Sequence, residues 1–322
     1  MPELSRLAIL DDYQGVARAL GPWERLPDGL RIEVFRDTVS DPDALAERLR
    51  PFDALVIMRE RTPFPRALIE RLPNLRLLVT TGMRNRSVDV AACAEAGVTV
   101  CGTPGFGNPT VDLTWGLILS VLRRIPEQER ALREGRWQPA PLGNTVEGKT
   151  LGVLGLGNLG TRVARVGAAF GMRVVAWSPN LTGGRAAAAG AALVDKAGLM
   201  AEADVLTLHL GLSERSRGIV GAEDIARMKR SAVVVNTSRG PLIDQAALVA
   251  ALREGRIAGA GLDVYDREPL PPDHPILSAP NTVLTPHLGY VTEENYRAYF
   301  EGAVEAVEGY LKGSPVRVLR AD

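Results

Sequence analysis

The glycine-rich segment at residues 155–160 constrains the fold of this chain more than any other feature. Gly155, Gly157 and Gly160 follow an apolar run at residues 151–154 and begin a stretch with apolar residues at helical spacing, residues 159–170. This order predicts a strand, a tight turn and a helix. Gly155 would form the turn, Gly157 would admit a ligand close to the backbone, and Gly160 would let the helix pack against the strand. Because a pyrophosphate binds well at such a helix N-terminus, the segment indicates a dinucleotide site, with a merely tight strand–helix turn as the alternative.

Short apolar runs alternate with helical patterns along the chain, which predicts parallel sheets covered by helices on both faces. The expected strands lie at residues 7–10, 32–35, 54–58, 75–79 and 98–100, and then at residues 151–154, 173–177, 192–194, 205–208, 232–236, 259–263 and 282–284. The expected helices include residues 44–50, 66–71, 88–96, 110–124 and 292–311. The fold class is therefore α/β, with two doubly wound parallel-sheet domains. The last helix can return to the first domain, which would make that domain discontinuous and leave a cleft between the two.

Composition narrows the class of protein. The formal net charge is zero, which gives no reason to expect nucleic acid or an anionic membrane as a partner. No segment reaches the roughly 18 apolar residues of a membrane span, and the first residues lack the apolar core of a signal peptide, so we expect a cytoplasmic protein. Cys93 and Cys101 lie in apolar surroundings without metal-ligand spacing, which predicts buried free thiols and no metal site.

Three polar residues each follow an expected strand in the second half of the chain: Arg239, Glu268 and His287. Strand ends of a parallel sheet form the edge at which ligands bind. The set suits a 2-oxo or 2-hydroxy acid, because arginine forks a carboxylate, histidine exchanges a proton with the carbonyl, and a neighbouring carboxylate orients the histidine. Taken singly, each residue also fits a plain loop position. Of the other histidines, His209 fits a strand cap and His274 a surface loop.

Four segments together resemble the D-isomer-specific 2-hydroxyacid dehydrogenases. Residues 148–157 resemble the cofactor motif of that family, residues 236–244 its arginine signature, residues 262–269 its glutamate signature and residues 285–289 its histidine signature, in family order. The resemblance implies that Arg239 grips the substrate carboxylate, that His287 gives and takes the proton, and that Glu268 is its partner.

The resemblance also implies a domain organisation and a set of binding residues. The substrate domain would be flavodoxin-like and cover residues 1–102 and 290–322, a Rossmann domain for NAD or NADP would cover residues 103–289, and the usual state is a homodimer. Asp263 matches an acid that contacts the nicotinamide carboxamide, and Thr237 and His209 lie where relatives line the cofactor cleft. The expected cofactor-binding residues are Gly155, Gly157, Asn158, Leu159, Gly160, Ser178, Asn180, His209, Thr237, Asp263 and Gly289; the expected substrate-binding residues are Arg59, Gly82, Met83, Arg84, Arg239 and Tyr290.

Ser178 departs from the usual cofactor pattern. An NAD site typically carries an acidic residue at this place for the ribose hydroxyls, about 20 residues past the first glycine. Without the carboxylate a 2′-phosphate is not repelled, and Ser178, Asn180, Thr182 or Arg185 can hold it. NAD and NADP therefore both stay open as cofactors.

The substrate loop also departs from the family pattern. Arg84 stands where many relatives have a second glycine, and with Arg59 and Arg61 it makes this region basic. Such a region suits a substrate with a second anionic group, while solvated surface arginines are the plain alternative. Tyr290 stands where many relatives have a small residue, so it can narrow the pocket or contact the substrate.

Several functions remain open from the sequence. A 2-oxo acid reductase of the glyoxylate or hydroxypyruvate type and a 3-phosphoglycerate dehydrogenase-like enzyme share the same signatures. A dinucleotide-sensing corepressor shares the fold and much of the catalytic set, because fold alone does not fix function. The partner expected for an enzyme is a small 2-oxo or 2-hydroxy acid, which the sequence does not name.

Overall fold

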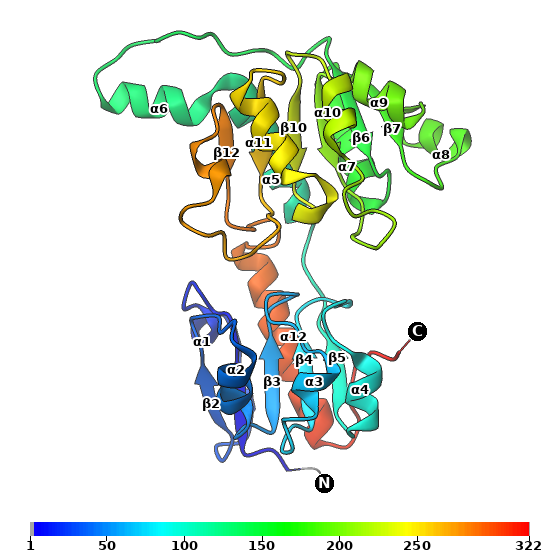
Figure 1. The fold of residues 1–322 in the computed structure, drawn as a ribbon. Coiled ribbons are helices and arrows are strands. Elements are labelled where there is room, and N and C mark those ends of the chain that lie inside the picture. The colour runs from blue at the N-terminus through cyan, green and yellow to red at the C-terminus, as the bar shows by residue number, and fades with distance from the viewer. Residues whose placement is uncertain (1–2, 322) are drawn as a thin grey trace. The chain divides into compact units, whose positions relative to one another are not determined.

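A computed structural model describes residues 3–321 and shows two compact units (Figure 1). The first comprises the chain up to Gly107 together with the chain from Val291 onward, and the second is Asn108–Tyr290. Each unit is a parallel sheet flanked by helices, so the predicted α/β class is confirmed. No helix within residues 3–321 combines the length and apolarity that crossing a bilayer requires.

The first unit holds a five-stranded sheet in the order β2-β1-β3-β4-β5. Its strands are β1 (Arg6–Ile9), β2 (Arg31–Val34), β3 (Ala54–Ile57), β4 (Leu77–Thr80) and β5 (Thr99–Gly102), and its helices are α1 (Ala17–Leu20), η1 (Trp23–Arg25), α2 (Pro42–Leu49), α3 (Arg66–Ile69), α4 (Val90–Glu95) and α12 (Glu293–Leu311). Residues of α2, α3 and α4 form one buried cluster with alternate residues of the strands. Helix α12, from the far end of the sequence, packs against α1, β4 and β5, with the ring of Phe300 5.9 Å from that of Trp23. The last helix thus completes the first unit.

The second unit holds a seven-stranded sheet in the order β12-β11-β10-β9-β6-β7-β8. Its strands are β6 (Thr150–Leu154), β7 (Arg173–Trp177), β8 (Ala192–Leu193), β9 (Val205–Leu208), β10 (Val233–Asn236), β11 (Gly259–Leu262) and β12 (Thr282–Leu284). Its helices are α5 (Pro109–Arg123), α6 (Ile125–Arg133), α7 (Asn158–Ala169), α8 (Gly183–Ala188), α9 (Lys196–Glu202), α10 (Ala222–Arg227), η2 (Gly240–Leu242), α11 (Gln245–Arg253) and η3 (Pro275–Ser278). One buried cluster joins α5, α7 and α8 to the sheet, and another joins α9, α10 and α11 to it.

The chain order of the second sheet reverses beside β6, because β6 pairs with β7 on one side and with β9 on the other. Ligands of doubly wound sheets bind at such a switch point, beyond the carboxyl ends of the strands. The glycine turn follows β6, and the expected catalytic residues follow β10, β11 and β12, so all of them belong to this edge of the sheet.

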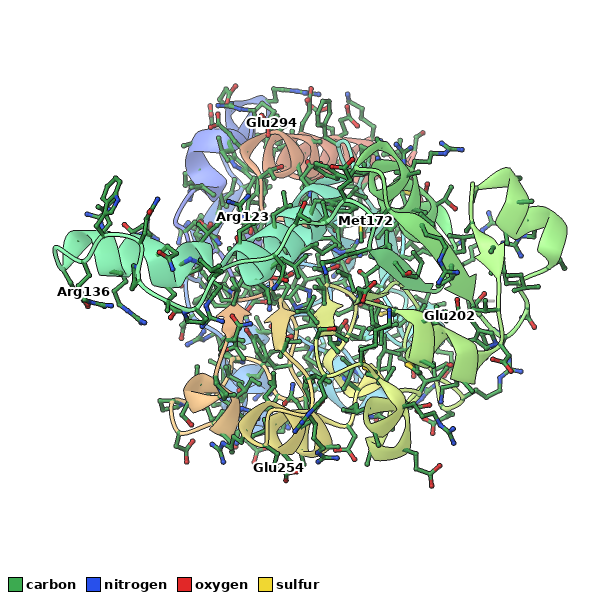
Figure 2. All side chains as sticks on the ribbon, turned by 90° about the horizontal axis from the view of Figure 1, so that it is seen from above. Arg123, Arg136, Met172, Glu202, Glu254 and Glu294 are labelled. Atoms are coloured by element: carbon green, nitrogen blue, oxygen red, sulfur yellow. The ribbon has the colours of Figure 1, made fainter. Side chains whose placement is uncertain are left out.

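The region after α5 differs from the sequence expectation. The helix expected over residues 110–124 is present as α5, but Arg124 then takes a left-handed conformation (φ 56°) and α6 begins with Pro126 in its first turn. Proline is tolerated there because the first N–H groups of a helix have no partner within the helix. Only Ala131 of α6 is buried, which explains why no apolar periodicity predicted this helix. Figures 1 and 2 show α6 extending away from the sheet of its unit, with Arg136 at the end of the projecting segment.

Candidate active site

The three glycines of the turn after β6 occupy three different environments. Gly155 has φ 101° and its N–H donates to Trp177 O at 2.8 Å, and a Cβ here would lie 2.8 Å from His209 O. A Cβ on Gly160 would lie 2.0 Å from Gly155 O, so α7 packs directly against the turn. A Cβ on Gly157 would meet no heavy atom of the described chain within 4 Å, which leaves open space over the backbone. These are the roles expected for a turn that receives a dinucleotide.

The N-terminus of α7 is open to a ligand. Gly157 is its N-cap, and no side chain of residues 3–321 caps the helix. Asn158 begins the helix, and its Oδ1 accepts from Arg162 Nε at 3.4 Å, while Leu159 packs against the buried cluster beneath. Uncapped N–H groups at a helix N-terminus attract a phosphate. The residues present therefore fit the pyrophosphate of NAD or NADP.

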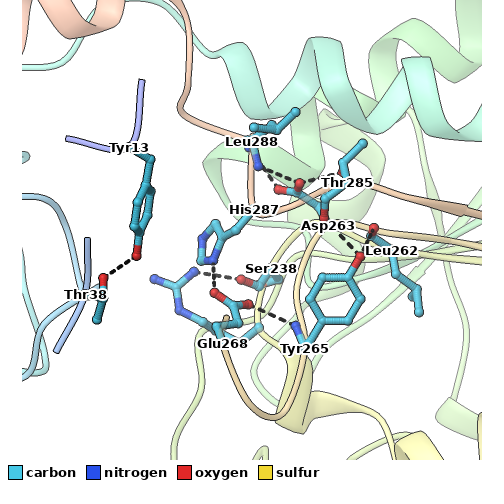
Figure 3. A network of polar contacts seen from close by, with 12 residues as sticks. Tyr13, Thr38, Ser238, Leu262, Asp263, Tyr265, Glu268, Thr285, His287 and Leu288 are labelled. Carbon is cyan, nitrogen blue, oxygen red and sulfur yellow. Dashed lines mark hydrogen bonds and ion pairs between the residues drawn. The ribbon is translucent and has the colours of Figure 1, made fainter. Parts of the chain in front are cut away.

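His287 and Glu268 form a contact at the ends of β12 and β11 (Figure 3). The distance from His287 Nδ1 to Glu268 Oε2 is 2.6 Å, and the Tyr265 backbone N–H donates to Glu268 Oε1 at 2.9 Å. Both side chains keep about a fifth of their surface exposed, 19% for His287 and 23% for Glu268. His287 has φ 56°, a left-handed conformation that costs roughly 1–3 kcal/mol in a residue other than glycine and concentrates at functional sites. Tyr290 sets its ring edge-on to the imidazole, with 5.8 Å between ring centroids.

Asp263 holds the loop that carries His287. Its carboxylate accepts from Thr285 Oγ1 at 2.6 Å, from Leu288 N at 2.6 Å and from Gly289 N at 2.9 Å, and the residue is fully buried (Figure 3). Burial raises the pKa of Asp263 above its ordinary value, and the hydrogen bonds only partly offset that rise. The loop is thus fixed on both sides of His287. Asp263 was expected to contact the cofactor, and no sequence pattern indicates these three hydrogen bonds, which we call the Asp263 clamp.

Arg239 follows β10, the strand between β9 and β11. Its Nη1 donates to Ser238 O at 2.7 Å. The buried Asn236 side chain holds the turn, since its Nδ2 donates to Arg239 O at 2.9 Å and its Oδ1 accepts from Ser238 N at 3.0 Å. A Cβ on Gly240 would lie 2.1 Å from Tyr265 C, so this turn packs directly on the backbone that holds Glu268. The β10 and β11 turns are therefore fixed to each other.

The remaining expected cofactor residues lie at neighbouring strand ends. Ser178 and Asn180 follow β7, where Ser178 O accepts from Leu181 N at 3.1 Å. His209 follows β9; its Nε2 lies 2.9 Å from Thr207 Oγ1, and burial lowers its pKa to about 4, so the imidazole is uncharged at neutral pH. Thr237 is buried, with its hydroxyl 2.7 Å from that of Thr114.

The substrate residues expected before residue 100 lie in the first unit. Arg59 follows β3 with φ 52°, and it donates to Thr81 Oγ1 through N–H at 2.8 Å and to Thr81 O through Nη1 at 3.2 Å. A Cβ on Gly82 would lie 1.8 Å from Arg59 Nη1, so glycine is required beneath this guanidinium. Met83 and Arg84 are both exposed beside it. Arg59 and Gly82 thus form one local arrangement.

The first unit contains a buried acid, Asp11, that was not among the residues expected from the sequence. Asp11 is 1% exposed, has φ 59°, and accepts from the hydroxyls of Thr38 and Thr62, the latter at 2.8 Å. The Thr38 hydroxyl also bonds to the Tyr13 hydroxyl (Figure 3). Burial raises the pKa of the Asp11 carboxyl. The signal available in the sequence was the acidic pair Asp11 and Asp12 directly after an apolar strand.

The glycine turn at a switch point and a histidine–carboxylate pair at adjoining strand ends define a nicotinamide-dependent oxidoreductase. The model of the D-isomer specific 2-hydroxyacid dehydrogenase NAD binding domain matches residues 115–289, more than half of the chain. The chain is 34% identical over 296 residues to a glyoxylate reductase of Korarchaeum cryptofilum, covering 90% of this chain and 89% of that protein. The chain belongs to the D-isomer specific 2-hydroxyacid dehydrogenase family.

Solved structures agree with this assignment. A phosphoglycerate oxidoreductase of Vibrio cholerae superposes with a TM-score of 0.90 at 42% identity, covering 96% of this chain and all of the other. An acyclic imino acid reductase, whose structure holds NADPH and D-Arg, superposes with a TM-score of 0.74 at 26% identity, covering 98% of this chain and 99% of the other. The predicted family is confirmed, and the chain is an NAD(P)-dependent dehydrogenase that interconverts 2-oxo and 2-hydroxy acids.

Proposed function

We propose that this enzyme reduces the carbonyl of a small 2-oxo acid, with His287 as proton donor, Glu268 as its partner and Arg239 as the anchor for the substrate carboxylate. The contact that carries the proposal is the 2.6 Å approach of His287 Nδ1 to Glu268 Oε2. Because Nδ1 faces the glutamate, Nε2 is the ring atom that exchanges a proton with the substrate.

The surrounding residues keep this pair in place. Tyr265 N–H holds the second oxygen of Glu268, and Asp263 fixes the backbone on both sides of His287. Arg239 presents a planar fork, which matches a carboxylate in two parallel hydrogen bonds. When bound, the nicotinamide supplies the hydride, while the protein supplies binding, orientation and the proton.

The cofactor would be held by the residues that the strand ends bring to this edge. Gly155, Gly157, Asn158, Leu159 and Gly160 would receive the pyrophosphate, Ser178 and Asn180 would face the adenosine ribose, and His209, Thr237, Asp263 and Gly289 would line the nicotinamide side. Gly157 supports this assignment, because the space over its backbone is open. Ser178 places no carboxylate beside the ribose, so we infer that NADPH is accepted as well as NADH.

The substrate class follows from the arginines. Arg59, Gly82, Met83, Arg84 and Tyr290 would join Arg239 in contacting the substrate. A glyoxylate- or hydroxypyruvate-type acid needs only the Arg239 fork. A 2-oxo acid with a distal phosphate is the second candidate. It is favoured by the Arg59 guanidinium, which lies over Gly82 and donates one hydrogen bond, from Nη1 to Thr81 O.

We infer a homodimer formed through the projecting segment that contains α6. Large apolar side chains on this segment face solvent in the single chain: Ile125 at 49%, Leu132 at 58%, Trp137 at 78% and Leu142 at 88% exposure. Exposed apolar residues gathered on one segment mark an interaction surface. Light scattering should give twice the chain mass, and Trp137→Ser with Leu142→Ser should shift it toward the monomer. A monomeric wild type at micromolar concentration would contradict the dimer.

We infer a cytoplasmic enzyme from its thiols and its cofactor. Cys93 and Cys101 are both buried as free thiols, which suits a reducing compartment. Fractionation of the source cells should place the chain with the soluble dehydrogenases. Recovery in a secreted or membrane fraction would contradict this location.

Turnover tests the proposed function directly. Glyoxylate, hydroxypyruvate, pyruvate, 2-oxoisocaproate, phenylpyruvate and phosphohydroxypyruvate would each be tested with NADH and NADPH. At least one should be reduced to the D-hydroxy acid with a kcat/KM above about 10⁴ M⁻¹ s⁻¹, the lower part of the usual range for enzymes. Cofactor binding without turnover on any of them would overturn the proposal and favour a dinucleotide-sensing role.

A further inference from the structure

The loops after β1, β2 and β3 meet at one edge of the first sheet, where hydrogen bonds between side chains join them. Asp11 follows β1, Thr38 follows β2 and Thr62 follows β3. The Asp11 carboxylate accepts from the Thr62 hydroxyl at 2.8 Å and from the Thr38 hydroxyl. The Thr38 hydroxyl also bonds to the hydroxyl of Tyr13 (Figure 3). We call these four residues the hydroxyl chain.

The turn that carries Tyr13 is fixed through its backbone as well. The buried Asp12 carboxylate accepts from Val16 N and from Ala17 N, each at 3.0 Å. The Tyr13 side chain is 42% exposed, and the guanidinium carbon of Arg61 lies 6.0 Å from the centroid of its ring. Tyr13 is therefore an exposed aromatic residue on a rigid turn, with its hydroxyl tied to the hydroxyl chain.

The carboxylate of Asp11 sets the direction of these hydrogen bonds. Burial raises the pKa of Asp11, and the bonds from the two threonine hydroxyls partly offset that rise. An ionised carboxylate only accepts, so Thr38 and Thr62 both donate to Asp11. The single hydroxyl hydrogen of Thr38 is thereby used, and Thr38 accepts the hydrogen of Tyr13. Toward any further group, the Tyr13 oxygen therefore acts only as a hydrogen-bond acceptor.

The edge of the sheet that carries Tyr13 also carries residues proposed for the substrate. Arg59 follows β3 and Gly82 follows β4, and β1 lies beside β3 in the parallel sheet. Tyr13 therefore belongs to the strand end next to the one that carries Arg59. Since Arg239 is proposed to hold the substrate carboxylate and His287 to serve the carbonyl, the distal part of the acid is what this edge would contact.

We propose that Tyr13 recognises a hydroxyl group on the carbon beyond the substrate carbonyl and makes the enzyme prefer a 3-hydroxy-2-oxo acid over the analogue that lacks this hydroxyl. The proposal rests on the proposed function, because it names the substrate class of the same site. A substrate hydroxyl can donate its hydrogen to an oxygen that only accepts, whereas a methyl group at the same place has none to donate. Asp11 and Thr38 act as positioning residues, because they fix the polarity of the Tyr13 oxygen.

Two pairs of acids that differ only in this hydroxyl test the proposal. Hydroxypyruvate and pyruvate are compared by kcat/KM. D-glycerate and D-lactate are compared by calorimetric binding to the enzyme saturated with NADH or NADPH, a complex in which no hydride transfer takes place. The wild type should prefer the hydroxylated acid of each pair.

Tyr13→Phe removes the acceptor oxygen and keeps the aromatic ring beside Arg61. It should lower the preference for the hydroxylated acid about 3- to 10-fold in both pairs, the usual effect of one neutral hydrogen bond. The loss should come from a higher KM for hydroxypyruvate, with kcat and KM for pyruvate unchanged.

Thr38→Val and Thr62→Val form a matched pair, because each removes one hydroxyl that donates to Asp11. Thr38 also bonds to Tyr13, so Thr38→Val releases the Tyr13 hydrogen and its oxygen is no longer restricted to accepting. Thr38→Val should therefore lower the preference for hydroxypyruvate about 3-fold. Thr62→Val should keep that preference while losing a similar amount of stability in urea unfolding.

An unchanged preference in Tyr13→Phe, or the same change of preference in the two threonine variants, would overturn the proposal. Equal losses of Tyr13→Phe on both acids of a pair would also overturn it, because the Tyr13 oxygen would then accept from a group of the protein instead of the substrate. If D-glycerate binding depends on Tyr13 but no 2-oxo acid is reduced, the proposed function fails and the role of Tyr13 stands. If both acids are reduced and Tyr13→Phe changes neither, the proposed function stands without it.

Discussion

Each unit has a buried aspartate beyond the end of a parallel strand, Asp11 in the first and Asp263 in the second, and these two have different roles. Asp263 of the second unit accepts two backbone N–H groups and one hydroxyl, all from the loop that carries His287. The carboxylate of Asp11 in the first unit accepts hydrogen bonds from the hydroxyls of Thr38 and Thr62. Burial raises the pKa of both carboxyls. A buried aspartate beyond a strand end therefore holds backbone groups in the second unit and side chains in the first.

The difference matters because hydroxyls and backbone amides have different freedom. A hydroxyl can turn to donate or accept, while a backbone N–H only donates. The loop around His287 is thus held in one geometry, as the proposed role of proton donor requires. The chain of hydrogen bonds from Asp11 through Thr38 to Tyr13 can reverse when the Asp11 carboxyl is protonated, and it reaches a tyrosine that is 42% exposed. Substitutions at both kinds of site test this contrast.

Replacing His287, whose loop is held by Asp263, should give the largest loss of activity. His287→Ala should lower kcat about 10²- to 10⁴-fold, the usual contribution of a positioned acid or base. Binding of NAD(P)H, followed by its fluorescence, should persist. His274→Ala is the control, because His274 caps η3 through Ile276 N and should keep full activity. Equal losses in the two variants would remove His287 from the chemistry.

Replacing Arg239 and replacing Arg59 should affect different substrates. Arg239→Lys keeps a charge but loses the fork, about 1.5–3 kcal/mol, which is one to two decades in kcat/KM for every 2-oxo acid. Arg59→Lys should matter little for glyoxylate and more for an acid with a distal phosphate. The measurement is kcat/KM for both variants on both substrates. Equal losses of kcat/KM on the two acids in Arg59→Lys would show that Arg59 does not recognise the distal phosphate.

Replacing Asp263 or Asp11 by asparagine tests whether backbone N–H donors and hydroxyl donors tolerate the change differently. Asp263→Asn turns an amide NH₂ toward backbone N–H groups that cannot reverse, so we expect a loss of about 1–3 kcal/mol in the free energy of unfolding and a lower kcat. In Asp11→Asn the new amide faces two hydroxyls, which can either donate or accept. The free energy of unfolding should therefore change by no more than about 1 kcal/mol. Urea unfolding of both variants measures the difference. Similar losses in the two would mean that burial, and not the kind of donor, sets the cost.

The pH dependence of stability should follow the raised pKa of Asp11. A carboxyl whose pKa is raised by folding stabilises the protein below its unfolded value, near 4, and that contribution is lost as the pH rises through the folded-state pKa. The wild type should therefore lose stability relative to Asp11→Asn as the pH rises from 4, until the folded carboxyl has ionised. Urea unfolding at several pH values checks this. An opposite slope would show that the Thr38 and Thr62 hydroxyls outweigh burial.

Thiol labelling reports on the first unit alone. Cys93 and Cys101 both lie there, and burial raises the pKa of each thiol to about 11. Neither should react with a thiol reagent at pH 8 in the folded protein, because thiolate is scarce and access is blocked. Asp11→Asn should speed labelling slightly and Asp263→Asn should not, if each aspartate stabilises its own unit. Faster labelling in Asp263→Asn would show that the units unfold together.

The sequence by itself determined most of the strands, the glycine turn and the proposed set of catalytic residues. Buried parallel strands are continuous apolar runs, and their carboxyl ends meet at one edge, so Arg239, Glu268 and His287 could be grouped from their positions alone. Helix α6 escaped this reasoning because only Ala131 of it is buried, and α1 because one turn carries too little periodicity.

Only the tertiary structure decided which groups touch. Asp263 accepts hydrogen bonds from the loop at residues 285–289, and Asp11 accepts them from Thr38 and Thr62. None of these contacts has a local signature, because side-chain direction and loop path are set by packing between elements distant in sequence. An aspartate after a strand looks the same in both units of this chain. The donors that surround it, which the fold brings from elsewhere, decide whether it holds the backbone of a loop or a pair of hydroxyls.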